Sequence, residues 1–587
     1  MVSPEAPRAW NRVIMVSDFH KLPRYQPRSF VPEGINFKDS QEVVGLFEKL
    51  LQRSINSAKE LEQWLNDRSE LQAALDQEGS VLYIRMTCQT DDQQRAKDYQ
   101  HFIENVVPAI KPLDDKLNHK YLEIVKKFPL DKNRFAVYHR GLQSDTDIFR
   151  KENVPLQTKV ALLSQEYQTL CGTMTVIFNG MEHTLPEMAK YLLDSNRDLR
   201  EAAWRATGQR RLQDKTKLDE IFDQMLGLRH QIAVNTGFNN FRDYQFRVYH
   251  RFDYTPGDCR KYHAAVEKVV IPLWKEILEQ RRAGMKLSAV RPWDLEVDPL
   301  GQPPLRPFED VQRLIGGVGE MFIKTDPKLG EQFQEMKKLG LLDLASRKGK
   351  APGGYQSTLA EARKPFIFMN AVGLDGDVRT LLHEGGHAFH ALACAHETLF
   401  EYRHGPMEFN EVASMAMELL GGEHIDIFYS PQEVKRSNQN HFGDIVGTLV
   451  WVATIDCFQH WIYENPNHTP AQRNQMWLSI RERFGGNFID WSGLEEFHKN
   501  LWHRQLHIFE VPFYYIEYAI AQLGALQIWV NAQKDKPAAL AAYQKGLSLG
   551  GSRSLPELYQ AAGIKFDFSE ETIAPLVQAV QREIGVN

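Results

Sequence analysis

Residues 377–390 read DVRTLLHEGGHAFH, and residues 409–420 read FNEVASMAMELL. The first segment holds His383, Glu384 and His387 in an H-E-x-x-H motif, with apolar residues at helical spacing around it. Asp377 has a side chain that commonly caps helix N-termini, so we expect the helix to begin immediately after it. This motif is the strongest signal in the chain, and the rest of the sequence is interpreted around it.

The spacing of the motif allows its two histidine side chains to bind the same metal ion. Residues four apart on a helix share a face, so the imidazoles of His383 and His387 can converge on one ion. Glu384 lies about 100° further round the helix, where its carboxylate can reach a water at the metal without being a ligand. The pattern predicts a zinc hydrolase site, and we favour it over two solvated or core histidines.

A third ligand is needed, because a catalytic zinc ion commonly takes three protein ligands and keeps one position open. His390 lies about 10.5 Å from His383 along an unbroken helix, too far for both to share an ion at bonds of about 2 Å. The ligand should come from another element. The helix expected at 409–420 carries Glu411 and Glu418 two turns apart, and spacing alone does not choose between them.

Three further histidines lie close to these segments in sequence. We expect His390, His396 and His404 to be ordinary structural histidines, and any of them could also contact a substrate.

HEGGHAFH followed by an F-N-E helix resembles the thimet oligopeptidase and oligoendopeptidase F family of zinc metallopeptidases. The resemblance implies that His383, His387 and Glu411 bind one Zn²⁺ per chain. It also implies that Glu384 is the general base of the reaction.

One position departs from thermolysin-like sites, which have Asp four residues after the glutamate ligand. Met415 stands there in this chain. The carboxylate that would support a zinc-bound histidine is therefore unassigned, and Glu418 is the nearest candidate.

A second segment with chemical character is residues 503–524, HRQLHIFEVPFYYIEYAIAQLG. Hydrolysis of an amide creates an oxyanion, and each donor aimed at it is worth about 10²- to 10³-fold in rate. In the resembled family a His and a Tyr cluster face the zinc, which implies this catalytic role for His507, Tyr515 and Tyr518. The alternative is aromatic packing in the core of an apolar helix.

The composition is that of a globular protein without a nucleic-acid partner. The chain has 587 residues, 43% hydrophobic and 25% charged, with a net charge of −6. Lys and Arg are spread along the sequence, and the five cysteines are odd in number and lack C-x-x-C spacing. The N-terminal residues contain no secretory apolar run, so we expect a cytoplasmic location with reduced thiols. Residues 511–530 are apolar around Glu517, but Pro512 and the polar residues favour a buried helix over a membrane span.

The order of patterns along the chain predicts two lobes. Amphipathic helical spacing recurs from residue 40 to about 285, and residues 291–307 contain five prolines. We therefore expect a mostly helical lobe at 1–290 and a zinc-binding catalytic lobe at 291–587, interleaved in space. Residues 365–370 predict a strand beside the zinc helix. That strand could pair with an extended substrate or be an ordinary core strand.

Taken together, the resemblance implies a mainly α, two-lobed zincin-type metallopeptidase with a deep central channel and a small β-sheet beside the zinc helix. It implies a zinc metalloendopeptidase that cuts internal bonds of short unfolded oligopeptides. Two alternatives remain open. One is a dipeptidyl carboxypeptidase or other exopeptidase, which would need a fixed cation at one end of the cleft. The other is a helical peptide-binding protein with a structural metal. We expect no membrane partner, and the sequence does not indicate the oligomeric state.

Overall fold

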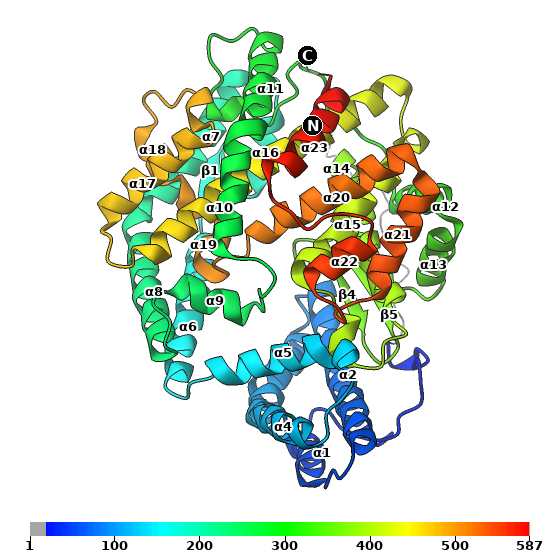
Figure 1. The fold of residues 1–587 in the computed structure, drawn as a ribbon. Coiled ribbons are helices and arrows are strands. Elements are labelled where there is room, and N and C mark those ends of the chain that lie inside the picture. The colour runs from blue at the N-terminus through cyan, green and yellow to red at the C-terminus, as the bar shows by residue number, and fades with distance from the viewer. Residues whose placement is uncertain (1–18, 586–587) are drawn as a thin grey trace. The chain divides into compact units, whose positions relative to one another are not determined.

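A computed structural model describes residues 19–585 and is mostly helical, with two small sheets (Figure 1). This confirms the predicted mainly α fold class. The chain groups into two compact units, each built from three separate segments. Unit 1 comprises Met1–Thr146, Leu305–Ser437 and Ala521–Phe566. Unit 2 comprises Asp147–Pro304, Asn438–Ile520 and Asp567–Asn587.

One border between the units lies at Pro304 and Leu305, inside the proline-rich stretch at 291–307. The division into lobes at 1–290 and 291–587, and the central channel between lobes, stay predictions.

The elements of unit 1, with short 3₁₀ or π helices marked η, are η2 (Phe19–Lys21), α1 (Ser40–Gln52), α2 (Ala58–Cys88), α3 (Gln93–His101), η3 (Phe102–Val106), α4 (Val107–Lys127), α12 (Val311–Thr325), α13 (Pro327–Lys338), β3 (Leu342–Ala345), β4 (Tyr355–Leu359), β5 (Lys364–Ala371), α14 (Asp375–Ala393), η7 (Phe400–Arg403), α15 (Met407–Gly422), η8 (Ile425–Ile427), α21 (Lys536–Ser548) and α22 (Leu555–Ala561).

The elements of unit 2 are α6 (Asn153–Gly172), β1 (Thr175–Phe178), β2 (Met181–Thr184), η4 (Glu187–Leu193), α7 (Arg197–Gln213), α8 (Lys215–Asn235), α9 (Phe241–Val248), α10 (Pro256–Ala265), η5 (Val266–Val270), α11 (Ile271–Gly284), η6 (Pro292–Asp294), α17 (Pro470–Arg483), η9 (Gly486–Phe488), α18 (Glu495–Lys499), η10 (Leu501–Arg504), α19 (Leu506–Glu510) and α23 (Glu570–Ile584). Three helices belong partly to each unit: α5 (Lys132–Ile148), α16 (Pro431–Glu464) and α20 (Ile516–Lys534).

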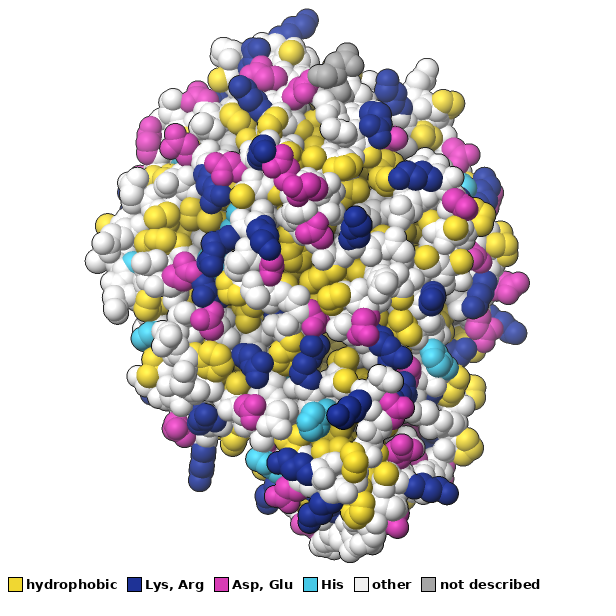
Figure 2. All heavy atoms as spheres, in the orientation of Figure 1, with side chains coloured by type: hydrophobic (Ala, Val, Ile, Leu, Met, Phe, Trp, Pro, Cys, Tyr) yellow, Lys and Arg dark blue, Asp and Glu magenta, His cyan; other side chains and the backbone are white. Residues whose placement is uncertain are grey.

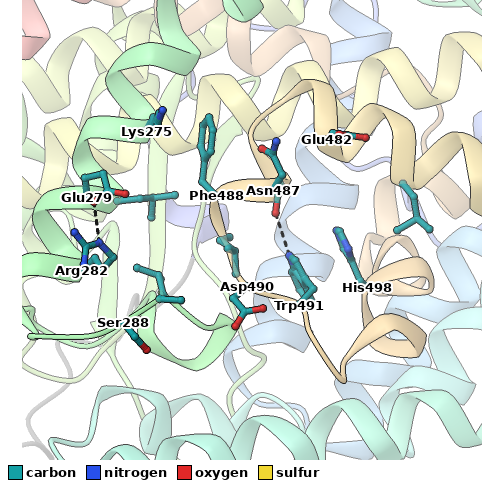
Figure 3. A pocket seen from close by; sticks show the side chains of 16 residues that line it. Lys275, Glu279, Arg282, Ser288, Glu482, Asn487, Phe488, Asp490, Trp491 and His498 are labelled. Atoms are coloured by element: carbon teal, nitrogen blue, oxygen red, sulfur yellow. Dashed lines mark hydrogen bonds and ion pairs between the residues drawn. The ribbon is translucent and has the colours of Figure 1, made fainter.

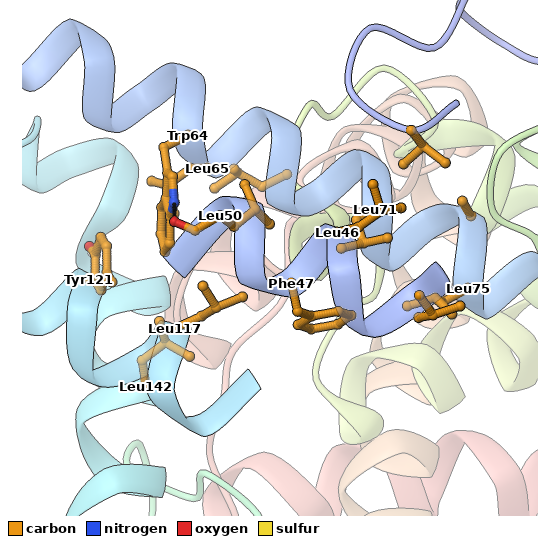
Figure 4. Close-up of a cluster of buried hydrophobic side chains, with 14 of the residues drawn as sticks. Leu46, Phe47, Leu50, Trp64, Leu65, Leu71, Leu75, Leu117, Tyr121 and Leu142 are labelled. Atoms are coloured by element: carbon orange, nitrogen blue, oxygen red, sulfur yellow. Dashed lines mark hydrogen bonds between the residues drawn. The ribbon is translucent and has the colours of Figure 1, made fainter. Parts of the chain in front are cut away.

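The N-terminal part of unit 1 has its own hydrophobic core, formed by α1, α2, α4 and α5 (Figure 4). The side chain of Asp39 caps α1 by accepting from the backbone N–H groups of Gln41 and Glu42. The apolar face predicted from this helix is buried, which confirms its amphipathic spacing. Trp64 fills the space between α1 and α2, and its indole N–H donates to the carbonyl of Leu50 at 2.9 Å.

The sheet of unit 1 has the strand order β3-β5-β4. β5 runs parallel to β3 and antiparallel to β4, and this confirms the strand predicted at 365–370. Both edges of β5 are already paired, so the expectation that this strand could take an extended substrate is wrong. Within the described residues, β4 lies at an edge of the sheet and could accept another strand.

A β-hairpin in unit 2 was missed by the sequence analysis. β1 and β2 pair antiparallel around a turn in which Asn179 and Gly180 have φ values of 50° and 77°. An Asn-Gly pair favours this turn because both residues tolerate positive φ.

By length and apolar composition α16 could cross a membrane, but 72% of its most apolar window is buried inside the protein, as in a core helix. The segment at 511–530 lies mainly in α20. On the face drawn in Figure 2, cationic and anionic side chains are interspersed without a large patch of one sign.

Candidate metal centre

The helix that carries the H-E-x-x-H motif is α14, and it begins at Asp375, three residues before the predicted start at Val378. Asp377 is therefore inside the first turn. Its Oδ2 accepts from the backbone N–H groups of Val372, Gly373 and Leu374 at 2.8, 2.8 and 2.9 Å. This carboxylate holds the turn that leads from β5 into α14 and also lies favourably at the positive end of the helix.

The glycine pair inside the motif allows other elements to approach α14 closely. A Cβ on Gly386 would lie 2.5 Å from the carbonyl oxygen of Ala413 in α15, and a Cβ on Gly385 would lie 2.4 Å from the ring of Phe322 in α12. Both distances are shorter than side chains tolerate. Gly386 therefore sets the close packing of α14 against α15, which carries Glu411, and Gly385 sets the packing of α14 against α12.

The three residues expected to bind zinc come together in unit 1. His383 Nε2 lies 3.4 Å, and His387 Nε2 lies 3.8 Å, from Oε2 of Glu411. Ligand atoms about 2.0–2.2 Å from a tetrahedral zinc ion are separated by roughly 3.3–3.6 Å. One ligand atom from each residue lies within 4.8 Å of the other two, so a small adjustment of the side chains would let the set hold a divalent ion. The side chains are 24%, 19% and 16% exposed, which leaves the cluster open to a water or substrate.

Glu418 lies two turns after Glu411 on α15 and contacts His383. Oε1 of Glu418 is 2.7 Å from Nδ1 of His383. Because Nδ1 is engaged by Glu418, Nε2 is the nitrogen of His383 that is left to bind a metal ion. Burial alone would lower the pKa of His383, but the adjacent Glu411 and Glu418 carboxylates raise it well above its usual value.

The carboxylates and His387 respond differently to burial. Burial would raise the pKa of Glu411, but the nearby imidazoles of His383 and His387 hold it below its usual value. Burial lowers the pKa of His387 to about 4. The hydroxyl of Ser414 also donates to Glu411, at 3.2 Å.

Glu384 is 7% exposed and has one carboxylate oxygen, Oε2, without a hydrogen-bond partner among the described residues. Burial, with the nearby charges of Glu411 and Glu418, raises its pKa to about 7. The backbone of Gln356 in β4 also interacts with this carboxylate. Glu384 therefore lies between the metal cluster and the edge strand, as a proton-transferring group would.

The three histidines expected to be structural are not part of the metal-ligating group. His390 is buried, burial lowers its pKa to about 3, and its ring contacts Phe409. His396 is exposed, with Nδ1 3.1 Å from the carbonyl of Ala393. His404 is exposed and its ring contacts Phe400.

His507, Tyr515 and Tyr518 form one ring cluster in unit 2. The centroids of His507 and Tyr515 are 4.8 Å apart, those of Tyr515 and Tyr518 are 5.4 Å apart, and all three side chains are half-buried. Because α20 begins at Ile516, Tyr515 precedes the helix and does not share a helical face with Tyr518 as the spacing predicted. The ring of Tyr515 contacts that of Tyr518 because the chain turns immediately before α20. The three side chains are partly exposed, whereas residues packed inside a core are fully buried.

The backbone before these tyrosines is held in an unusual conformation. Phe513 has φ of 67°, which a non-glycine residue rarely adopts. Its N–H donates to Oε1 of Gln459 at 2.9 Å, and its carbonyl accepts from Arg251 at 2.6 Å. Arg251 also forms a buried ion pair with Glu517 at 2.6 Å. These contacts fix the direction in which the tyrosine segment leaves the turn.

Another possible metal-ligating group lies in unit 2 and was missed by the sequence analysis. It consists of Cys259 on α10 with Asp456 and His460 on α16, all buried. Nε2 of His263, one turn after Cys259, donates to Oδ2 of Asp456 at 2.8 Å. The C-x₃-H and D-x₃-H spacings were the available signal. A catalytic zinc ion needs an open position, so this closed group is the weaker candidate for chemistry.

Comparison with known proteins agrees with this arrangement. Peptidase family M3 matches residues 190–577, more than half of the chain, and the Peptidase M3 N-terminal domain matches residues 35–149. The chain belongs to peptidase family M3. The resemblance to oligoendopeptidase F is thereby confirmed.

Two curated relatives in this family are each 23% identical to the chain. They are "Oligopeptidase PepF" of Bacillus subtilis, matched over 311 residues, and "Oligoendopeptidase F homolog" of Borreliella burgdorferi, matched over 247 residues. The matches cover 50% and 40% of this chain but only 44% and 41% of those relatives.

Solved structures match over nearly the whole chain. A protein described as an oligoendopeptidase F is 27% identical with a TM-score of 0.84, covering 96% of this chain and 99% of that one. Pz peptidase A, solved with an inhibitor, is 27% identical with a TM-score of 0.83, covering 95% and 98%.

Proposed function

We propose that this chain is a zinc-dependent metalloendopeptidase that hydrolyses internal peptide bonds of short oligopeptides. The observation that carries the proposal is the cluster of His383, His387 and Glu411 around one point, with Glu384 beside it. Membership of peptidase family M3 supports the reaction class. The names of the relatives, oligopeptidase and oligoendopeptidase, support short peptides as substrates.

In this proposal His383, His387 and Glu411 would hold a zinc ion, whose Lewis acidity would acidify water and polarise the scissile carbonyl. Glu384 takes the proton of the attacking water and delivers it to the leaving nitrogen, so its raised pKa suits both transfers. Glu418 keeps His383 in the ligating tautomer. His507, Tyr515 and Tyr518 would donate hydrogen bonds to the oxyanion of the tetrahedral intermediate.

The edge strand β4 is the element we assign to binding the peptide backbone. It lies at an edge of its sheet, and Gln356 on it interacts with Glu384. An extended peptide added along this edge would be held by main-chain hydrogen bonds, which read no particular sequence. We expect the reaction in the cytoplasm, because the five cysteines are free and disulfides are rare in that compartment.

The Glu384→Gln variant tests the mechanism. General-base catalysis typically contributes about 10²- to 10⁴-fold, so kcat on an internally quenched peptide should fall by about that factor. Zinc content should stay near one per chain by elemental analysis, because Glu384 is not a ligand. Cleavage at the parental rate by this variant would disprove the assigned base.

The same peptide with both termini blocked separates an endopeptidase from an exopeptidase. Continued cleavage at internal bonds supports the proposal, and loss of cleavage favours the exopeptidase. A matched digest after chelation, and again after zinc is restored, tests the metal requirement.

A further inference from the structure

Unit 2 contains a cavity of about 300 Å³ whose wall carries three arginines, Arg211, Arg481 and Arg504. Trp204, Trp274, Trp451 and Trp491 also line it. A volume of this size lies at the lower end of ligand pockets and can hold the end of a small molecule or peptide.

The guanidinium groups of the cavity have no protein anion bound to them. None of the three forms a hydrogen bond or an ion pair within residues 19–585. Arg481 is only 6% exposed, and its Nε has no partner. Burial, together with the charge of Arg504, lowers the pKa of Arg481 to about 10. A buried cation without an anion is costly, so a group of this kind is usually kept for a ligand.

The ring of Trp451 packs against two of the arginines without neutralising their charge. The guanidinium carbons of Arg481 and Arg504 lie 5.3 and 5.4 Å from the ring centroid of Trp451. Such cation–π contacts orient the flat guanidinium groups but leave their N–H donors available. Glu296 also lines the cavity and acts on Arg504 at longer range, without an ion pair, so the cavity keeps an excess of positive charge.

In a second cavity of the same unit, by contrast, the arginine is paired with a carboxylate of the protein. It has a volume of about 760 Å³ and shares Ile489 and Trp491 with the first (Figure 3). There Arg282 donates to Glu279 at 2.8 Å, as Figure 3 shows, and its cation is neutralised by the protein itself. Unpaired arginines are therefore a property of the smaller cavity and not of this surface in general.

The wall of the arginine cavity continues into the proposed oxyanion donors of the same unit. Trp451 donates from its indole nitrogen to Gln505 at 2.9 Å, and Nε2 of Gln505 is 2.8 Å from Nδ1 of His507. Burial raises the pKa of Tyr515, while hydrogen bonds with Trp451 and Gln505 and the charge of Arg504 act in the opposite direction.

We propose that this cavity binds a carboxylate of the peptide substrate between Arg481 and Arg504. The planar fork of a guanidinium matches the two oxygens of a carboxylate, and peptides offer that group at the C-terminus or on an acidic side chain. The inference rests on the proposed peptidase function and adds to it a preference for peptides that carry such a carboxylate.

Three internally quenched peptides of one sequence test the proposal: a free C-terminal acid, its amide, and an amide with Glu near the C-terminus. Each is measured with the zinc-loaded parent, Arg481→Met, Arg481→Lys and Arg282→Met. Charge-assisted hydrogen bonds to arginine are strong, so the parent should bind a carboxylate peptide with a KM about 10-fold or more below that of the plain amide. Arg481→Met should remove this difference, Arg481→Lys should keep part of it, and Arg282→Met should behave as the parent.

The pattern of results identifies the source of the carboxylate. Preference for the free acid assigns the C-terminus, and preference for the Glu-containing amide assigns an acidic side chain. Equal KM values for all three peptides, or a preference that Arg481→Met leaves intact, would overturn the proposal. If Arg481→Met does not fold, Arg504→Met provides the same comparison, because Arg504 is exposed to the cavity.

Binding without turnover separates this inference from the proposed function. Acetylated dipeptides, as acid, amide and Glu-containing amide, are titrated into the Glu384→Gln protein while tryptophan fluorescence is followed. Binding of the acid, or of a Glu-containing amide, that depends on Arg481 supports the cavity even if no peptide is cleaved, and equal binding of the acid, the amide and the Glu-containing amide contradicts it.

Discussion

Two clusters of histidine and carboxylate side chains, one in each unit, differ mainly in their access to solvent. In unit 1, His383 and His387 stand one turn apart on α14 and face Glu411 with side chains 16–24% exposed. In unit 2, Asp456 and His460 stand one turn apart on α16, and both are buried. Helical spacing is the same in both, so spacing alone does not separate reactive groups from structural ones.

The contacts inside the two clusters explain this difference. His263 lies at hydrogen-bonding distance, 2.8 Å, from Asp456, so the unit 2 cluster neutralises itself within the protein. In unit 1 the separations of 3.4 and 3.8 Å between Glu411 and the histidines are too long for good hydrogen bonds and suit a shared ion. The comparison predicts that changes in unit 2 affect stability while changes in unit 1 affect zinc.

The largest effect on stability is expected for Asp456→Asn. Removing one partner of a buried ion pair leaves the other charge unpaired, which typically costs about 3 to 5 kcal/mol. The free energy of unfolding in urea should fall by this amount, while zinc content and kcat of the folded protein should change little.

An exposed pair gives the control. His119 and Asp115 are 3.8 Å apart with side chains 56% and 33% exposed, and Asp115→Asn should change the free energy of unfolding by less than about 0.5 kcal/mol. Loss of zinc from Asp456→Asn would show that the two clusters are not independent.

The sequence, through the family resemblance, predicted the grouping of His383, His387 and Glu411, and it missed the unit 2 cluster for a physical reason. H-E-x-x-H lies within one helix, so local spacing is enough to place its side chains together. Cys259 and Asp456 are nearly 200 residues apart, and only the packing of α10 and α16 in three dimensions brings them together.

The next effect concerns the close packing that brings Glu411 to the histidines. Gly386→Ala would place a Cβ 2.5 Å from the carbonyl oxygen of Ala413, so α14 and α15 must move apart. Overpacking of this kind costs about 1 to 3 kcal/mol, and zinc affinity, measured by competition with a chromogenic chelator, should fall as well.

Gly376→Ala is the matched control in the same helix, since a Cβ there meets nothing within 4 Å. It should keep both stability and zinc affinity. Equal behaviour of the two variants would show that Gly386 does not set the helix spacing.

The position of β4 and the start of α14 show where sequence reasoning fell short. The strand at 365–370 was recognised from its apolar run, but its place between β3 and β4 depends on long-range pairing. Asp377 has a capping side chain, yet it acts from inside the first turn because the chain leaving β5 already bends at Gly373, which has φ of 93°. Local patterns predicted these elements, and tertiary contacts decided their partners.

A smaller effect, on zinc affinity alone, is expected when the carboxylate of Glu418 beside His383 is replaced. Glu418→Gln removes the charge at 2.7 Å from His383 but keeps an amide oxygen that can accept its N–H. Loss of such a supporting group weakens metal binding by about 10-fold at the lower end. Glu423→Gln, at the C-terminal end of α15 and paired with Lys536, should leave zinc affinity unchanged. Equal zinc affinity in both variants would contradict the supporting role of Glu418.

The smallest expected effect is the pH dependence of the stability that the Asp456–His263 pair of unit 2 contributes. Burial would raise the pKa of Asp456, but His460 and His263 hold it below its usual value, while Asp456 raises the pKa of His263 against burial. Cys259, Tyr262 and Cys457 are further titratable groups close to this pair, and Arg251 acts on Cys259. The Asp456 contribution is lost as pH falls below about 4, and the His263 contribution is lost as pH rises above about 6.5. The difference in free energy of unfolding between the parent and Asp456→Asn should therefore be largest between these values, and a constant difference from pH 4 to 9 would show that the pair is not ionised.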